Sequence, residues 1–435
     1  MANSQMYVEH AIYKCFAKNP RYRRELSRDD LASPDQVYSV FFETENSDST
    51  DGYNSEVIFG RIIYEDERGK KQCGDSIMVK QMLVSDTEIR SKFTDVTFSN
   101  EIFVYSRIIP FFASFSQDIW SMFPKFYYGD VTLGRGYLLE DEAAIIILEN
   151  LSASGYRLAK ARTFLDIEEL RLIVKKLAHF HAYSYYAKSK SPREFYSLVS
   201  NLINTNYTDT KEKLGFININ SDHHIDVISK DERYAKKAEF IRGILKDADE
   251  FMCRMFKTAR EPMAVLCHGD FLRNNVMLKY NAAGQPVDVK FFDLPCCRYC
   301  SPIIDLALIL YMNTDQKTRD LYWNELIDVY CSSLQEPFPD VQVPSKEQVV
   351  EEFKINSLNA FLAVAFFLPQ MMRLDEIPNY DIRNYYLPEL AEFVDASWFD
   401  IPSDLERVAW KKVRKPHHEQ AVLEVLKDII DRGYV

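Results

Sequence analysis

The stretch that decides the fold is VLCHGDFLRNNVMLKYNAAGQPVDVKFFD, Val265–Asp293. Two apolar runs flank the turn-like segment NAAGQP, and this pattern predicts a β-hairpin. If Gly284 marks the middle of the turn, Asn275 pairs with Asp293, because both lie equally far along the chain from that glycine. An antiparallel register of this kind brings an amide and a carboxylate side by side at one end of a rigid ribbon.

The polar residues of this hairpin suit phosphoryl transfer. Mg²⁺ takes oxygen ligands, usually one or two from the protein, so Asn275 and Asp293 together form a suitable pair. Asp270 lies on the loop that enters the same hairpin. Phosphoryl transfer needs a carboxylate that orients or deprotonates the attacking hydroxyl, metal ligands, and a cation for the other phosphates. The three residues can fill the first two roles.

The cation is expected upstream, in a strand that precedes a helix. In SIMVKQM, strand alternation places Lys80 on the face opposite Ile77 and Val79, so that one face can pack in a core while the other borders a cleft. In FSNEIFVY, Glu101 lies at the edge of an apolar helical stripe. The two residues are therefore predicted to form an ion pair.

The spacing of apolar residues changes near residue 150. Short β-branched and aromatic runs precede this point, at 37–42, 57–64 and 77–84. Together they predict a small antiparallel sheet. Beyond Leu151 apolar residues recur every three or four positions, as in 167–181, where Asp166 and Glu169 predict a capped helix start. A sheet-rich part is thus followed by a mainly helical part.

Composition and charge disfavour several classes of binding partner and one class of nucleotide-binding loop. The formal net charge of −12 disfavours nucleic acid and anionic membranes as partners. The longest apolar run, 360–368, ends at Pro369 and is shorter than the ~20 residues that span a bilayer. The first residues lack the apolar core of a secretion signal, so we expect a cytoplasmic protein with reduced cysteines. Only 13 residues are glycine, which disfavours a multi-glycine nucleotide loop.

The order of these motifs is similar to that of the kinase-like phosphotransferases, which include protein kinases, choline kinases and aminoglycoside phosphotransferases. More closely, four segments resemble the ecdysteroid kinase-like family, also called CHK kinase-like. They are ILENLSASGYR, KKLAHFHAYS, LCHGDFLRNNVMLKY and FFDLPCCRYCSPIIDL. The resemblance implies an α+β, bilobal protein-kinase-like fold of the aminoglycoside phosphotransferase and choline kinase type. The expected parts are a nucleotide-binding sheet lobe (1–148), a hinge (149–153) and a helical lobe (154–435) with the catalytic hairpin 265–293.

The resemblance also implies roles for the residues above. It makes Asp270 the catalytic base and assigns Asn275 and Asp293 to Mg²⁺. Lys80, paired with Glu101, would bind the α and β phosphates of ATP. Further supporting roles fall on three groups of residues. His268 and Asp305 would support the catalytic loop, the backbone of Glu149 to Leu151 would form the hinge against adenine, and Gly52, Asn54 and Ser55 would form a minimal phosphate turn.

Two departures from the wider pattern bear on the substrate. Leu294-Pro295 follows Asp293, where the family has Phe-Gln and protein kinases have Phe-Gly. Leu272 stands where protein kinases carry a lysine, and only a short segment separates Asp293 from Asp305. This leaves little room for peptide docking, so a small-molecule alcohol is the expected acceptor. The resemblance suggests an ecdysteroid or a hydroxylated xenobiotic.

Several alternatives stay open at this point. A choline or ethanolamine kinase activity would use the same scaffold, and Leu294-Pro295 makes a catalytically silent nucleotide-binding pseudokinase conceivable. The CCRYC cluster at 296–300 and the pair His417-His418 lack the second ligand pair of a zinc site. His181 is expected to be a packing residue of its helix. The sequence is silent on the oligomeric state.

Overall fold

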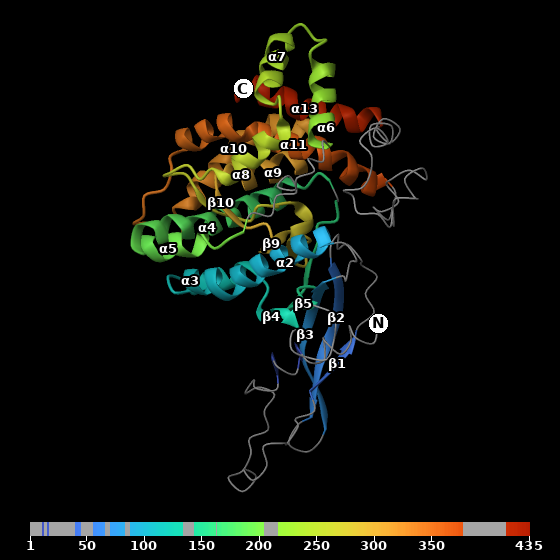
Figure 1. Ribbon diagram of the computed structural model, residues 1–435, viewed down its shortest axis with the longest axis vertical. Coiled ribbons are helices and arrows are strands. Elements are labelled where there is room, and N and C mark those ends of the chain that lie inside the picture. Colours follow the sequence, from blue (N-terminus) through green and yellow to red (C-terminus); the bar gives the residue numbers. More distant parts are fainter. Residues whose placement is uncertain are drawn as a thin grey trace.

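The computed structural model describes residues 11–12, 15–16, 40–44, 55–65, 70–82, 88–133, 143–161, 163–203, 216–376 and 415–435. Strands dominate the first part of the described chain and helices dominate the rest, as the sequence predicts (Figure 1). The chain thus has the predicted α+β, bilobal kinase-like fold. The exact limits 1–148, 149–153 and 154–435 stay predictions.

Three sheets organise the strands. The strands are β1 (Val40–Thr44), β2 (Ser55–Glu65), β3 (Lys71–Met82), β4 (Phe126–Leu133), β5 (Ala143–Glu149), β6 (Tyr156–Arg157), β7 (Val265–Cys267), β8 (Val276–Tyr280), β9 (Pro286–Phe291) and β10 (Arg298–Cys300). The large sheet has the order β1-β2-β3-β5-β4, and the small ones are β6-β8-β9 and β10-β7. All pairs are antiparallel.

Helices fill the remainder of the described chain. They include α2 (Glu88–Phe103), α3 (Ile109–Ala113), α4 (Ile167–Lys190), α5 (Pro192–Val199), α6 (Phe216–Ile228), α7 (Ala235–Ile244), α8 (Ala248–Lys257), α9 (Ile303–Asn313), α10 (Gln316–Leu334), α11 (Lys346–Glu376) and α13 (Pro416–Asp431). In Figure 1, α2 and α3 lie between the large sheet and the later helices, and α6, α7 and α13 lie at the opposite end of the molecule.

The large sheet buries its two faces against different partners. On one face Ile77 and Val79 pack with apolar side chains of β2, β5 and the N-terminal segment. The alternate residues of β5, including Ile146 and Leu148, belong to the main core that continues into the helical lobe, and Met78 packs against that core. Because side chains alternate, Lys80 shares the Met78 face. Lys80 thus lies on the face opposite Ile77 and Val79, as strand alternation predicts.

Helix α4 begins where the sequence predicts, and it packs against elements that carry the site. The side chain of Asp166 accepts a hydrogen bond from the Glu168 N–H at 2.9 Å, and Glu169 accepts one from the Asp166 N–H at 3.1 Å, which completes a capping box. Its buried stripe packs beside α10 and β9. Every residue of α9 is buried, so a polar residue on that helix needs partners inside the protein.

The catalytic hairpin forms, but its register differs from the prediction by one residue. Val276 lies opposite Phe291, so Asn275 faces Phe292, whose N–H donates to the Asn275 carbonyl at 3.1 Å, and not Asp293. The turn closes between Asn281 and Gln285, and the register then shifts between Lys279 and Tyr280. The turn therefore centres one residue before Gly284, and the register shift recovers only part of that offset.

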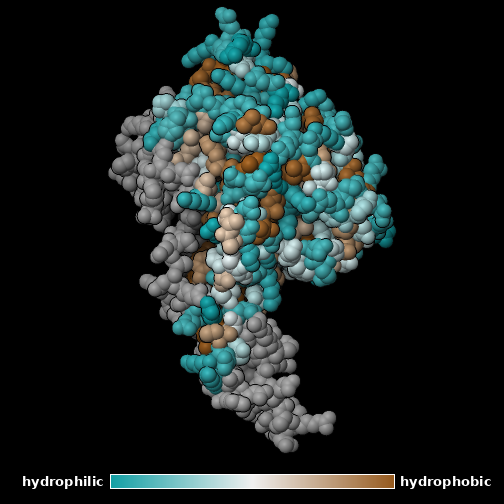
Figure 2. Space-filling model, turned by 180° about the vertical axis from the view of Figure 1, so that it is seen from behind, coloured by the Kyte–Doolittle hydropathy of each residue, from teal (hydrophilic) through white to brown (hydrophobic). Residues whose placement is uncertain are grey.

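Helix α11 is longer than the apolar run within it. It continues through Pro369, where the apolar run 360–368 ends, to Glu376. The stretch Lys346–Met372 is long and apolar enough to cross a membrane, yet 72% of its most apolar window is buried inside the protein. Burial of this kind is typical of a core helix. On the side of the molecule seen in Figure 2, hydrophilic residues dominate the surface and apolar ones form small patches.

Candidate active site

The predicted ion pair forms at the junction of the sheet and α2. Lys80 projects from β3 between Val57 and Ile146, and its Nζ lies 2.7 Å from Glu101 Oε2. The same Nζ lies 2.5 Å from Asp293 Oδ1. Glu101 is buried, whereas the Asp293 side chain is 38% exposed. One ammonium therefore joins a carboxylate from each lobe, and the side that remains accessible belongs to Asp293.

The chain after Asp293 adapts to Leu294 and Pro295 without withdrawing the carboxylate. Asp293 has a φ of 64°, a left-handed conformation that Asp and Asn adopt more readily than most residues. Leu294 is fully buried, and its N–H donates to Glu101 Oε1 at 3.3 Å. The Pro295 carbonyl accepts a hydrogen bond from the Asn100 side chain at 3.1 Å. Helix α2 is thus attached to this segment by two consecutive residues.

The catalytic loop places Asp270 beside Asn275. The amide nitrogen of Asn275 donates to the Asp270 carboxylate at 3.0 Å and to its backbone carbonyl at 2.8 Å. Because the amide nitrogen of Asn275 is directed at Asp270, its amide oxygen faces away from Asp270. Among the described residues, this oxygen has one contact, the Asn274 amide nitrogen at 3.5 Å. This orientation suits an oxygen ligand of a hard cation.

Asp305 holds the backbone of that loop through hydrogen bonds. Its two carboxylate oxygens accept hydrogen bonds from the His268 N–H at 2.6 Å and the Gly269 N–H at 2.8 Å. The ring of His268 contacts the Phe292 carbonyl at 2.9 Å and thereby joins the loop to the hairpin. The side chains of His268 and Asp305 are fully buried. These contacts correspond to the supporting roles that the resemblance implies for His268 and Asp305.

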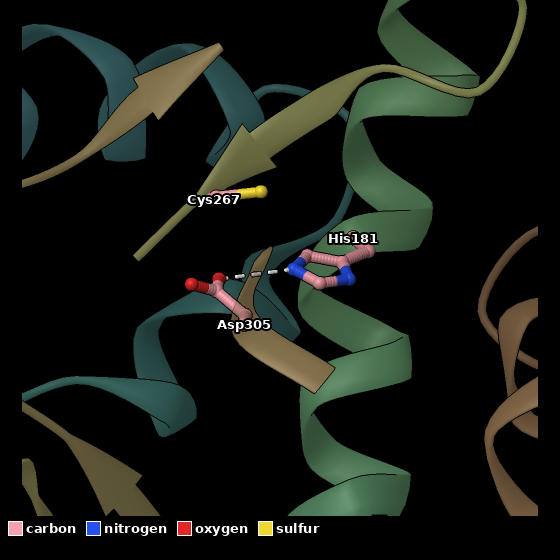
Figure 3. A group of neighbouring side chains, drawn as sticks. All are labelled: His181, Cys267 and Asp305. Atoms are coloured by element: carbon pink, nitrogen blue, oxygen red, sulfur yellow. Dashed lines mark hydrogen bonds and ion pairs between the residues drawn. The ribbon is translucent and has the colours of Figure 1, made fainter. Parts of the chain in front are cut away.

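His181 adds a contact that sequence reasoning missed. Its Nε2 lies 3.3 Å from Asp305 Oδ2, and its Nδ1 lies 2.8 Å from the Tyr330 hydroxyl. Figure 3 shows His181 projecting from α4 toward Asp305, with Cys267 beside them. The helical pattern predicts His181 as a packing residue because it stands in the apolar stripe of α4. His181 is buried as expected, but its ring also belongs to the hydrogen-bond network that supports the loop.

The same three residues could be mistaken for a metal centre. The ligand atoms of His181, Cys267 and Asp305 lie within 4.8 Å of one another. However, both Asp305 oxygens already accept backbone N–H groups, and the Cys267 thiol is directed at the Ser301 carbonyl at 3.3 Å. Burial raises the pKa of this thiol well above its usual range, whereas a metal needs the thiolate. We therefore interpret the group as structural support.

The electrostatics of the site favour an additional cation. Burial raises the pKa of Asp270; His268 opposes this and the Asp293 carboxylate adds to it. Burial likewise raises the pKa of Glu101, although Lys80 partly opposes it. For Asp293 the Lys80 ammonium outweighs burial and lowers the pKa. Burial also opposes the charge of Lys80, but Asp293 and Glu101 outweigh it and raise that pKa. Glu101 and Asp293 thus share one ammonium, and the Asp293 charge also acts on Asp270; a divalent cation beside Asp293 would relieve this crowding of negative charge.

Of the remaining predicted residues, Glu149 and Leu151 lie inside the described chain, Ser55 lies at one of its edges, and Gly52 and Asn54 lie outside it. Glu149 ends β5, and its carboxylate binds the Ser154 hydroxyl at 2.5 Å and the Lys125 N–H at 3.2 Å, so it stabilises the connection between the lobes. The Leu151 carbonyl accepts N–H groups from the following turn. Ser55 is the first residue of β2, whereas Gly52 and Asn54 lie outside the described residues. The phosphate turn stays a prediction.

Asn100 is a second residue that the sequence pattern did not identify. Its side chain donates to the Ile203 carbonyl at 2.6 Å and accepts from the Ile203 N–H at 3.0 Å, in addition to its bond with Pro295. The only sequence signal was its position next to Glu101. Its partners lie about a hundred or more positions away, so no local pattern could have identified them.

Comparison with known proteins gives one match. A family model, described as the ecdysteroid kinase-like family, matches residues 49–343 and so covers both halves of the site. No curated protein matches the chain. The family is one of kinase-like phosphotransferases that act on small molecules. Because the match spans most of the chain and includes every residue described above, the chain belongs to the ecdysteroid kinase-like family.

Proposed function

We propose that the protein uses ATP and Mg²⁺ to phosphorylate the hydroxyl group of a small molecule. The observation that carries this proposal is the position of the Lys80 ammonium, 2.7 Å from Glu101 and 2.5 Å from Asp293, while Phe292, the neighbour of Asp293, is hydrogen-bonded through its backbone to Asn275 of the Asp270–Asn275 loop. A cation that could bind phosphate, two oxygens that could bind a metal and a potential base thus come from three separate segments of the chain.

Each residue then has a defined task. The Asp293 carboxylate and the Asn275 amide oxygen would hold Mg²⁺, and Lys80, oriented by Glu101, would bind the phosphates of ATP. Bound Mg²⁺ supplies charge neutralisation for the transferring phosphoryl group. Asp270 accepts the proton of the attacking hydroxyl, and the Asn275 amide keeps its carboxylate in place.

The acceptor we propose is a polar steroid of the ecdysteroid type or a hydroxylated xenobiotic. Family membership supports a small molecule. The chain between Asp293 and Asp305 supports it too, because β10 within this segment pairs directly with β7 and leaves no long loop for binding a peptide. The alternative acceptors, choline and ethanolamine, would need a cage for an ammonium group.

The test is transfer of radiolabelled phosphate from ATP to a panel of ecdysone, choline and ethanolamine, with and without Mg²⁺. We expect ecdysone to be labelled only when Mg²⁺ is present. Asp270→Asn should lower kcat by about 10²- to 10⁴-fold with little change in ATP affinity, the usual loss of a general base. Asp340→Asn, the same change at an exposed carboxylate, is the matched control.

Three outcomes would contradict the proposal. Labelling of choline or ethanolamine in place of ecdysone would transfer the assignment to the alternative acceptor class. ATP binding without turnover on any alcohol would favour the silent pseudokinase. Near-normal turnover by Asp270→Asn would show that the base lies elsewhere.

A further inference from the structure

Lys290 joins the catalytic hairpin to two segments of the sheet lobe. It lies on β9, three residues before Asp293, and its side chain is 13% exposed. Its Nζ donates a hydrogen bond at 2.9 Å to the carbonyl of Phe123, which lies shortly before β4. The same Nζ lies 3.4 Å from Oε2 of Glu149, the last residue of β5. One ammonium therefore connects three separate segments of the chain.

The carboxylate that Lys290 meets is itself held in a fixed position. Glu149 Oε1 accepts a hydrogen bond from the Ser154 hydroxyl at 2.5 Å, and its Oε2 accepts one from the Lys125 N–H at 3.2 Å. Burial opposes the negative charge of Glu149, but these hydrogen bonds and Lys290 outweigh burial and lower the pKa of the carboxyl group. Glu149 is therefore charged at neutral pH, and it passes the contact with Lys290 on to the turn that follows the hinge.

A second contact attaches the same hairpin to the chain after the hinge. Tyr156 pairs with Lys279 of β8, and its hydroxyl donates to Asp288 Oδ2 at 2.6 Å. Asp288 and Lys290 are alternate residues of β9, so they point to the same face of that strand. The Lys290 ammonium also lies 5.6 Å from the centre of the Tyr156 ring. The hinge is thus attached to β9 at both of its ends.

The next residue of β9 packs against the catalytic loop. The centre of the Phe291 ring lies 4.8 Å from that of Phe271, the residue after Asp270, and 6.2 Å from that of Phe123. Phe123 is therefore held through its carbonyl by Lys290 and through its ring by Phe291. Strand β9 thus connects the hinge, the segment before β4 and the catalytic loop.

The hinge has a backbone group that can bind a ligand. Among the described residues, none accepts a hydrogen bond from the Leu151 N–H, whereas the N–H groups of its neighbours Asn150 and Ser152 have protein partners. Adenine carries ring-nitrogen acceptors that suit such a group. The other end of ATP, the triphosphate, would lie at Asp293. The separation between the hinge and Asp293 must therefore match the length of one nucleotide.

We propose that Lys290 is a positioning residue for ATP: it holds the hinge and the Asp293 end of the catalytic hairpin at the separation that the adenine and the triphosphate of one nucleotide require. This inference rests on the proposed function and adds to it the residue that couples the two halves of the nucleotide site. Two parts of a ligand bind more tightly when they are joined, because the second contact becomes intramolecular, and this gain is lost when the two subsites are not correctly spaced.

The first experiment compares ATP with its two parts. Dissociation constants for ATP, adenosine and tripolyphosphate are measured with Mg²⁺ by ligand-observed NMR titration in wild type, Lys290→Met and Lys290→Arg. We expect Lys290→Met to weaken ATP binding about 10-fold, the effect of losing one hydrogen bond to a charged group. The affinities for adenosine and for tripolyphosphate should each change less than about twofold, because neither part spans the two subsites. Lys290→Arg, which keeps the charge and the donors, should restore most of the ATP affinity.

Lys279→Met is the matched control. The Lys279 ammonium lies over the same Tyr156 ring, at 5.4 Å, but the residue is exposed on the neighbouring strand. This variant should bind all three ligands as wild type does. Lys290→Gln, which keeps a donor without the charge, replaces Lys290→Met if the latter does not fold, with the same expected loss. Unchanged ATP affinity, or an equal fall for ATP and for one of its parts, would overturn the proposal.

The next measurement tests the link between Lys290 and the hinge. ATP affinity is compared for Lys290→Met, Glu149→Gln and the double variant. If the two residues act through one contact, the loss in the double variant should be clearly smaller than the product of the two single losses. Losses that simply multiply would overturn the link to the hinge.

Neither measurement needs turnover, so failure of this inference can be distinguished from failure of the proposed function. If no alcohol is phosphorylated but ATP and its parts respond to Lys290→Met as expected, the proposed function is overturned and this inference is supported. Phosphate transfer by Lys290→Met with a wild-type KM for ATP would overturn this inference alone. A wild-type protein that binds no ATP would overturn both.

Discussion

Asp270 and Lys80 are held in place by different kinds of contact. Asp270 lies on a loop whose supports, Asp305 and His181, are buried within the helical lobe. Lys80 lies on the sheet, and its carboxylate partners come from both sides, Glu101 from α2 and Asp293 from the hairpin. The proposed base is thus fixed within one lobe, whereas the proposed phosphate-binding cation is fixed by contacts between lobes.

This difference separates two kinds of failure. A defect beneath the catalytic loop should destabilise the helical lobe and lower the rate together. A defect at the junction of the lobes should weaken nucleotide binding while leaving the helical lobe folded. The following changes are ordered from the largest expected effect to the smallest, and each one can break this distinction or sharpen it.

Asp305→Asn should have the largest effect. An amide cannot accept from the His268 and Gly269 N–H groups with both of its atoms, so one buried donor is left facing another. Breaking a buried charged network of this kind costs about 3 to 5 kcal/mol of unfolding free energy. Urea unfolding at neutral pH measures it, with Asp340→Asn as the control. A loss of rate without a loss of stability would contradict the assignment of Asp305 to structural support.

The pH dependence of that loss has a defined sign. His181 outweighs burial and lowers the pKa of Asp305 in the folded protein. A carboxylate whose pKa is lowered on folding contributes stability that is complete above its unfolded pKa of about 3.9 and is lost as the pH falls through the folded value. The difference between wild type and Asp305→Asn should therefore shrink in acid.

Lys80→Met should act on the nucleotide and not on the fold of the helical lobe. The ammonium would make charge-assisted contacts with phosphate, which contribute about 1.5 to 3 kcal/mol. ATP affinity should fall roughly 10- to 100-fold by titration calorimetry. Lys125→Met is the matched control, because that lysine borders the same sheet with a side chain that is 58% exposed. Unchanged ATP affinity in Lys80→Met would remove Lys80 from the phosphate site.

Asn100→Ala tests the junction itself. The change removes the hydrogen bonds to Ile203 and Pro295, each of which is expected to contribute about 1 kcal/mol. We expect the KM for ATP to rise several-fold while kcat changes less, because α2 would no longer hold Glu101 firmly. Asn201→Ala, which removes an exposed bond to the Ser197 carbonyl, is the control. An equal fall in kcat would mean that the junction also positions Asp270.

The smallest effect concerns the wild-type pH profile. Burial and the Asp293 charge raise the pKa of Asp270, with His268 opposing them. Because the ionised form must accept the proton, kcat/KM should fall in acid at a pH above the ordinary aspartate value of about 3.9. A profile that stays flat to that pH would contradict the raised pKa.

The sequence pattern could predict those residues whose position depends on their near neighbours in the chain. Strand alternation placed Lys80 on the correct face, and the capping signal placed the start of α4. The hairpin register was wrong because the turn closes between Asn281 and Gln285 and so centres one residue before Gly284, which the pattern of apolar residues does not show. His181 and Asn100 escaped because hydrogen bonds to partners more than a hundred positions away leave no trace in periodicity.

The left-handed backbone of Asp293 has a practical consequence for anyone who needs an inert version of this protein. Asparagine tolerates that conformation nearly as well as aspartate, so Asp293→Asn would weaken cation binding while preserving the turn. Alanine or valine would change the chemistry and strain the chain at once, and any loss of function would then have two indistinguishable origins. The choice of the knockout residue therefore decides whether such a result can be interpreted.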